Sequence, residues 1–143
     1  IKPEAVKDFG VTLVSREELL AQSDFISMHL LLNEDTRKSI NADFFKKMKN
    51  SAIFVNTARG SLVDEDALIE ALRTGEIAGA ALDVLTEEGI DKDAPLQKFD
   101  NVIITPHAAW YSEQAFYTLL TSAAQEVVRA LHGEPVKNQV NHF

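Results

Sequence analysis

Five short apolar segments alternate along this chain with segments of helical pattern, and this alternation restricts the fold more than any other feature. The apolar segments are residues 11–14, 25–29, 52–55, 78–84 and 102–105. Strands that alternate with helices form βαβ units and a mostly parallel sheet. Near-continuous apolar strands are typical of parallel sheets that are covered on both faces. The sequence therefore predicts an α/β fold, with a mostly parallel sheet and flanking helices.

The helical segments begin and end at residues that commonly cap helices. Ser15 and Glu18 have the spacing of a capping box, and Asn41 is placed to cap the next helical turn. Asp64 and Gly75 enclose a further helix. A long helix is predicted over about residues 112–132, because apolar side chains recur there with the 3.6-residue period.

The composition restricts the classes of partner that the chain can bind. The formal net charge of the 143 residues is -8, which argues against a nucleic-acid surface. The sequence has no cysteine, which excludes disulfides and thiolate metal sites, and we expect no metal site. No apolar run is long enough to span a membrane, and no signal peptide opens the sequence. We therefore expect a cytoplasmic protein without a membrane partner or direct nucleic-acid contact.

Chemically able side chains follow the predicted strands at their carboxyl ends. These positions are residues 29–31, residues 56–59, Asp83 with the glutamates behind it, and residues 105–107. Ligands of open parallel sheets bind beyond the carboxyl ends of the strands. We therefore expect a binding site where these four groups of residues come together.

An arginine, a histidine and a glutamate among them form a coherent chemical set. Arg59 offers a rigid fork of donors that suits a carboxylate, and His107 can exchange a proton near neutral pH. Either Glu87 or Glu88 could hold the imidazole in place. Such a set would bind an anionic carbonyl compound and protonate its oxygen. Residue type alone leaves structural alternatives open, since Arg59 could form a surface ion pair and the glutamates could be solvated.

Several stretches of the sequence resemble the signatures of one enzyme family. They read LLAQSDFISMHLLLNEDTRKSIN from residue 19, VNTARGSLVDEDAL from residue 55, AGAALDV from residue 78 and DNVIITPHAAW from residue 100. In this order they resemble the D-isomer-specific 2-hydroxyacid dehydrogenases over nearly the whole chain. The resemblance implies a Rossmann-like domain, NAD as cofactor, and reduction of 2-oxo acids to D-2-hydroxy acids by hydride transfer from NADH.

The resemblance also implies roles for single residues. Arg59 matches the arginine that binds the carboxylate and carbonyl of the substrate, and His107 matches the acid/base. Glu88 matches the glutamate that pairs with this histidine, since 88 − 59 = 29 positions separate it from the arginine, as in the family. Asp83 matches the aspartate that orients the nicotinamide carboxamide. The other cofactor-binding positions that the resemblance implies, beside Arg59 and His107, are Leu30, Leu31, Leu32, Thr36, Thr57, Ala58, Ala108, Ala109 and Trp110.

Two features refine the position of the chain within the family. TPHAAWYSEQA from residue 105 and LNE from residue 32 look most like the C-terminal-binding-protein branch. The Gly-x-Gly-x-x-Gly loop that cradles the pyrophosphate is absent, and so is the front part of the substrate domain. We therefore expect residues 1–111 to be the second half of a dinucleotide-binding domain. Residues 112–143 are expected to form a long helix and a tail that return toward the substrate domain.

The predicted function is that of an NAD-dependent oxidoreductase of which this chain is one part. We expect the chain alone to be inactive, because it lacks the loop that binds the phosphates. Self-association to a homodimer is expected, because a truncated sheet exposes an unpaired edge. Two alternatives stay open: a non-catalytic, corepressor-like binding module that senses nucleotides, and an inactive truncated remnant.

Overall fold

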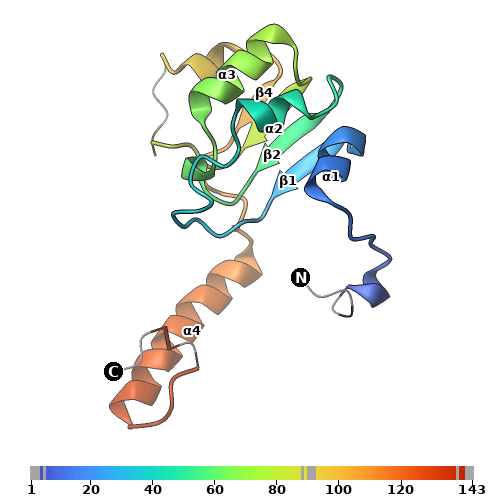
Figure 1. The fold of residues 1–143 in the computed structure, drawn as a ribbon. Helices are drawn as coiled ribbons and strands as arrows, with labels where there is room; N and C mark the ends of the chain where they lie inside the picture. Colours follow the sequence, from blue (N-terminus) through green and yellow to red (C-terminus); the bar gives the residue numbers. More distant parts are fainter. Residues whose placement is uncertain (1–3, 5, 88, 90–92, 138, 141–143) are drawn as a thin grey trace. The chain divides into compact units, whose positions relative to one another are not determined.

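A parallel sheet of four strands forms the centre of the larger of two compact units. The computed structural model describes residues 4, 6–87, 89, 93–137 and 139–140. The units are Ile1–His107 and Ala108–Phe143. In the first unit the strands are β1 (Phe25–Met28), β2 (Ile53–Asn56), β3 (Gly79–Leu82) and β4 (Val102–Ile104), in the spatial order β1-β2-β3-β4 and all parallel (Figure 1). The predicted α/β fold with a parallel sheet is confirmed.

The helices of this unit begin at the capping residues that the sequence indicates. Helix α1 (Arg16–Gln22) has the Ser15 hydroxyl as acceptor for the Glu18 amide at 3.1 Å. Helix α2 (Ala42–Lys46) has the Asn41 side chain as acceptor for the Phe44 amide at 3.2 Å. Helix α3 (Glu65–Thr74) ends at Gly75, whose φ of 71° is the left-handed conformation that glycine adopts without strain. Short 3₁₀ turns span η2 (Lys7–Phe9), η3 (Gly60–Leu62) and η4 (Pro95–Lys98).

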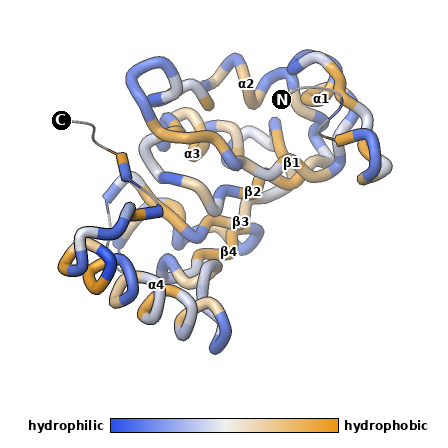
Figure 2. The backbone as a smooth tube through the Cα atoms, turned by 90° about the horizontal axis from the view of Figure 1, so that it is seen from below, coloured by the Kyte–Doolittle hydropathy of each residue, from blue (hydrophilic) through white to orange (hydrophobic). Residues whose placement is uncertain are grey.

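The core lies between one face of the sheet and helices α2 and α3, which pack against each other on that face (Figure 2). Phe44 and Phe45 of α2 meet Phe54 of β2 edge to face, with the Phe45 and Phe54 rings 5.4 Å apart at 87°. Edge-to-face packing is the favoured arrangement of aromatic rings. This cluster fixes α2 over β2 and so fixes the direction in which the carboxyl end of β2 points.

The predicted strand at residues 11–14 is wrong. The structure has no strand there, and Val11, Leu13 and Val14 are exposed. An extended segment becomes a strand only when a neighbour satisfies its backbone groups. Within the described part of the chain, β1 pairs with β2 alone, and no strand lies beside residues 11–14. The apolar pattern of this segment is real, but it has no ladder partner here.

The two faces of the sheet differ in how far their side chains are exposed, whereas the sequence predicted cover on both faces. Burial alternates along β1 and β2, and on the face opposite the core Phe25 is 72% exposed and Ile103 is 67% exposed. The expectation of cover on both faces is therefore not met within the described residues of Ile1–His107. Apolar surface of this extent is typical of a face on which further elements pack.

The second unit, Ala108–Phe143, consists mainly of the long helix α4 (Glu113–Leu131). The Ser112 hydroxyl accepts a hydrogen bond from the Ala115 amide at 3.0 Å, and His132 caps the carboxyl end. The predicted long helix is confirmed. Among the described residues, no helix combines the length and the apolar character needed to cross a membrane.

Candidate active site

Three strand ends place functional side chains at one edge of the sheet. Arg59 follows β2, Asp83 follows β3 and His107 follows β4. Because β2, β3 and β4 are parallel neighbours, their carboxyl ends lie along the same edge. Asp83 and His107 line one open pocket, together with Glu87, Thr105 and Pro106. The convergence predicted for Asp83 and His107 is thus present in the structure.

Asp83 is fixed by Thr105, the residue that follows β4. Its side chain is only 5% exposed, and the Thr105 hydroxyl donates a hydrogen bond to its Oδ1 at 2.5 Å. The Asp83 carbonyl in turn accepts the backbone amide of His107 at 3.0 Å. Thr105 lies in the predicted group of residues 105–107, but the sequence assigned it no role. Its signal was visible, since it is the polar residue that closes the apolar segment VIIT.

His107 has a backbone conformation that L-residues seldom adopt. Its φ is 53°, in the left-handed region, and its amide is held by the carbonyls of Asp83 and Thr105, both at 3.0 Å. A side chain in this region costs about 1 kcal/mol relative to glycine. Strain of this kind persists where the surrounding structure holds it, and it gathers at functional sites.

We expect His107→Gly to be more stable than His107→Ala by about 1 kcal/mol, because only glycine relieves the positive φ. Urea unfolding of the two variants measures this difference. Thr57 is the control, because it is exposed and its φ is not positive. There Ala should be at least as stable as Gly. An equal or higher stability of His107→Ala than of His107→Gly would contradict the strain.

Arg59 is presented to solvent by a tightly held turn. Its side chain is exposed, and its Nη1 donates to the adjacent Ala58 carbonyl at 2.6 Å. Among the described residues, no Asp or Glu carboxylate lies within 4.0 Å of its guanidinium. The surface ion pair that the sequence left open is therefore not formed in this part of the chain. The two donor edges of the guanidinium suit a planar carboxylate.

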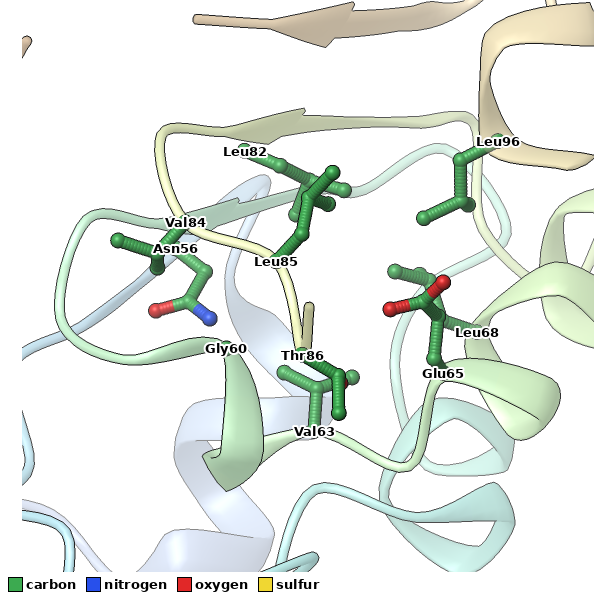
Figure 3. A pocket seen from close by; sticks show the side chains of 10 residues that line it. All are labelled: Asn56, Gly60, Val63, Glu65, Leu68, Leu82, Val84, Leu85, Thr86 and Leu96. Carbon is green, nitrogen blue, oxygen red and sulfur yellow. The ribbon is translucent and has the colours of Figure 1, made fainter. Parts of the chain in front are cut away.

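Gly60 explains the position of this turn. A Cβ atom on Gly60 would lie 1.9 Å from the Leu85 carbonyl oxygen and 2.5 Å from the Thr86 nitrogen. Figure 3 shows Gly60 beside Thr86 in the pocket that these residues line. The segment after Arg59 thus packs directly on the backbone of the segment after Asp83, which only glycine permits.

A second pocket joins Arg59 to the segment after β1. It is lined by His29, Ala58, Arg59 and the run of leucines at 30–32. Leu30 and Leu31 are exposed and Leu32 is half-buried. Thr36 fixes this segment, since its hydroxyl donates to the Leu31 carbonyl at 2.7 Å. The structure therefore brings these three leucines, which are predicted cofactor-binding positions, together with Ala58 and Arg59.

The remaining predicted site residues are Glu88, Thr57, Ala108, Ala109 and Trp110. Glu88 lies outside the described residues, whereas Glu87 is exposed and lines the pocket of His107. Thr57 is exposed at the end of β2. Ala108, Ala109 and Trp110 belong to the second unit, where Trp110 packs edge to face on Tyr111 at 5.5 Å. The described residues contain no cluster of His, Asp or Glu that could hold a metal ion.

Comparison with known proteins places this edge in context. The model of the family "D-isomer specific 2-hydroxyacid dehydrogenase, NAD binding domain" matches residues 1–109. The chain is 41% identical over 138 residues to glyoxylate/hydroxypyruvate reductase B of Cronobacter sakazakii, with 96% of this chain and 43% of the relative covered. It is 43% identical over 140 residues to the glyoxylate reductase of Aeropyrum pernix, with 98% and 42% covered.

Solved structures agree with these relatives. The D-lactate dehydrogenase of Lactobacillus jensenii, determined with NAD+, superposes with a TM-score of 0.88 at 34% identity, over 99% of this chain and 46% of that one. The chain thus spans less than half the length of each of these three relatives. On the match to its family model and the identity along nearly all its length, the chain belongs to the D-isomer specific 2-hydroxyacid dehydrogenases, and its residues 1–109 match the model of their NAD binding domain.

Proposed function

We propose that the protein to which this chain contributes reduces small 2-oxo acids to D-2-hydroxy acids with NADH. The observation that carries the proposal is the carboxyl edge of the sheet, where Arg59, Asp83 and His107 follow three adjacent parallel strands. Arg59 is an exposed cation without a carboxylate partner in the described part of the chain. The names of the relatives, glyoxylate reductase and D-lactate dehydrogenase, support a short 2-oxo acid as substrate.

The residues at this edge fit a bound dinucleotide. Asp83 offers a buried carboxylate that Thr105 holds in one orientation, which suits the donor groups of a carboxamide. The leucines at 30–32 offer an apolar wall to a flat ring system. NADH supplies a hydride when it is bound. We propose that the protein uses NAD rather than NADP, on the grounds of its family alone.

In the proposed mechanism the chain binds, orients and protonates. Arg59 binds the substrate carboxylate through its donor fork and polarises the adjacent carbonyl. The imidazole of His107 gives its proton to the carbonyl oxygen, which becomes the hydroxyl of the product. Glu88 is proposed to hold this imidazole by a hydrogen bond, and Asp83 to orient the nicotinamide. The bond changes balance, since one hydride and one proton convert the carbonyl to an alcohol.

A chimaera would test this function. In it, the chain replaces the 140 residues that it matches in the Aeropyrum pernix glyoxylate reductase. The chimaera should oxidise NADH when glyoxylate is added, followed at 340 nm, and the isolated chain should not. Absence of glyoxylate-dependent oxidation in a folded chimaera would overturn the proposal.

Asp83→Ala in this chimaera should raise the KM for NADH by about tenfold or more, because one charge-assisted hydrogen bond to the cofactor is lost. Steady-state kinetics with NADH as the varied substrate measure the effect. Asp100→Ala is the control, since Asp100 lies just before β4, at the opposite edge of the sheet. An equal KM in both variants would remove Asp83 from the cofactor site.

We further propose that the protein is a cytoplasmic homodimer. The exposed Phe25 and Ile103 on the open sheet face, and the exposed apolar side chains of α4, supply surface for association. Reduced nicotinamide cofactor is available in that compartment. The division into residues 1–111 and 112–143, and the likeness to the C-terminal-binding-protein branch, remain predictions.

A further inference from the structure

Asn56 is a polar residue in a position where the fold favours an apolar one. It closes β2, and its partners across the sheet are Met28 on β1 and Leu82 on β3. This row of residues faces the core, and Asn56 is 0% exposed. A buried amide stabilises a core less than an apolar side chain does unless its donors and acceptor are all paired. Its presence therefore calls for a reason outside the core.

The Asn56 side chain bonds to the turn that carries Arg59. Its Oδ1 accepts the Ala58 amide at 3.0 Å, and its Nδ2 donates to the Arg59 carbonyl at 3.0 Å. Figure 3 shows this carboxamide pointing toward Gly60, the residue that follows Arg59. The buried carboxamide of Asn56 thus holds the turn at two points, the amide of Ala58 and the carbonyl of Arg59.

The backbone of Asn56 connects this turn to the other strand ends. Its carbonyl accepts the Asp83 amide at 2.9 Å, and the Asp83 carbonyl accepts the His107 amide at 3.0 Å. The guanidinium of Arg59 stands on a flexible stem, so its reach is set by where its backbone lies. A catalytic arginine has to be held to within a fraction of an ångström of its productive position.

We propose that Asn56 is the positioning residue of Arg59, and that its buried carboxamide sets where the guanidinium meets the substrate carboxylate relative to Asp83 and His107. This inference rests on the proposed function for the role of Arg59. The claim that Asn56 holds the turn does not depend on the proposed function. The hold on the turn and the role in substrate binding can therefore be tested separately.

The first measurement is amide hydrogen exchange of the isolated chain by NMR. In Asn56→Ala the Ala58 amide should exchange at least about tenfold faster, beyond any change in global stability, because it loses its acceptor. Asn101→Ala is the matched control, since Asn101 also bonds a backbone carbonyl across the sheet, that of Ala78 at 2.8 Å, at the opposite edge. It should leave the Ala58 amide unchanged. Asn56→Leu serves if Asn56→Ala does not fold, because leucine nearly matches the shape of asparagine but offers no acceptor to the Ala58 amide and no donor to the Arg59 carbonyl.

The second measurement uses the chimaera described above. Asn56→Ala or Asn56→Leu should raise the KM for glyoxylate about tenfold or more while the KM for NADH changes less than about twofold. A structural role alone would lower the amount of folded enzyme and move neither KM. Unchanged exchange at Ala58 in both variants, or a KM for glyoxylate equal to that of Asn101→Ala, would overturn the proposal. If the unsubstituted chimaera shows no turnover, the proposed function fails, and the exchange result alone still decides whether Asn56 holds the turn.

Discussion

Replacing Arg59 by alanine in the chimaera should lower kcat/KM for glyoxylate by about 10³-fold, because the cation that binds the carboxylate and polarises the carbonyl is lost. Arg59 is exposed at the end of β2 and is free of carboxylates in the described part of the chain, so no structural ion pair is broken. Initial rates at saturating NADH measure the effect. The KM for NADH should change much less than kcat/KM for glyoxylate, since Asp83 is proposed to orient the nicotinamide.

Arg59→Lys separates charge from geometry. A lysine keeps the charge but has no fork of donors, so it should recover only part of the loss. Full activity of the lysine variant would show that a simple positive charge suffices. Wild-type activity of Arg59→Ala would exclude Arg59 from the reaction and with it the proposed substrate anchor.

Gly60→Ala should destabilise the isolated chain by about 3 kcal/mol, because the new methyl group meets backbone that cannot turn aside. The Cβ would lie 1.9 Å from the Leu85 carbonyl oxygen, inside any allowed contact. Relief requires the turn after Arg59 to separate from the segment that follows Asp83. Urea unfolding measures the loss of stability, and the chimaera should lose activity in parallel.

Gly75→Ala is the control for this substitution. Gly75 has a φ of 71°, and a Cβ there meets nothing within 4 Å. Its replacement should therefore cost only the strain of the left-handed conformation, about 1 kcal/mol. If Gly60→Ala cost no more than Gly75→Ala, the close packing of the two loops would not be a constraint of the fold.

The parallel sheet and its helices were predictable because their signals are local. The capping residues Ser15 and Asn41 and the left-handed Gly75 act within a few residues of chain, and each does so in the structure. The strand predicted for residues 11–14 was wrong because strand formation does not depend on local signals alone. A strand depends on a neighbour that may lie anywhere in the sequence, and apolar alternation carries no information on whether that neighbour is present.

In the candidate site, too, residues with a local sequence signal were predictable, and residues that act through packing were not. Arg59, Asp83 and His107 were predicted because each follows a strand and lies in a motif that resembles a family signature. Gly60 and Thr105 contribute through contacts with the segment that begins at Asp83, and such contacts become visible only when the sheet is assembled. The Asn56 side chain bonds locally to the turn that carries Arg59, and what the sequence does not show is its burial. Spacing along the chain identifies the groups that act, whereas packing identifies the groups that hold them.

The central claim is tested most directly by the configuration of the product. The chimaera is given pyruvate and NADH, and the lactate that forms is resolved by chiral chromatography, with Arg59→Ala as the matched negative control. The account predicts D-lactate, in an amount equal to the NADH consumed, and almost none from the variant. L-lactate, or equal amounts of D-lactate from both proteins, would contradict the assignment of this edge as the site of D-specific reduction.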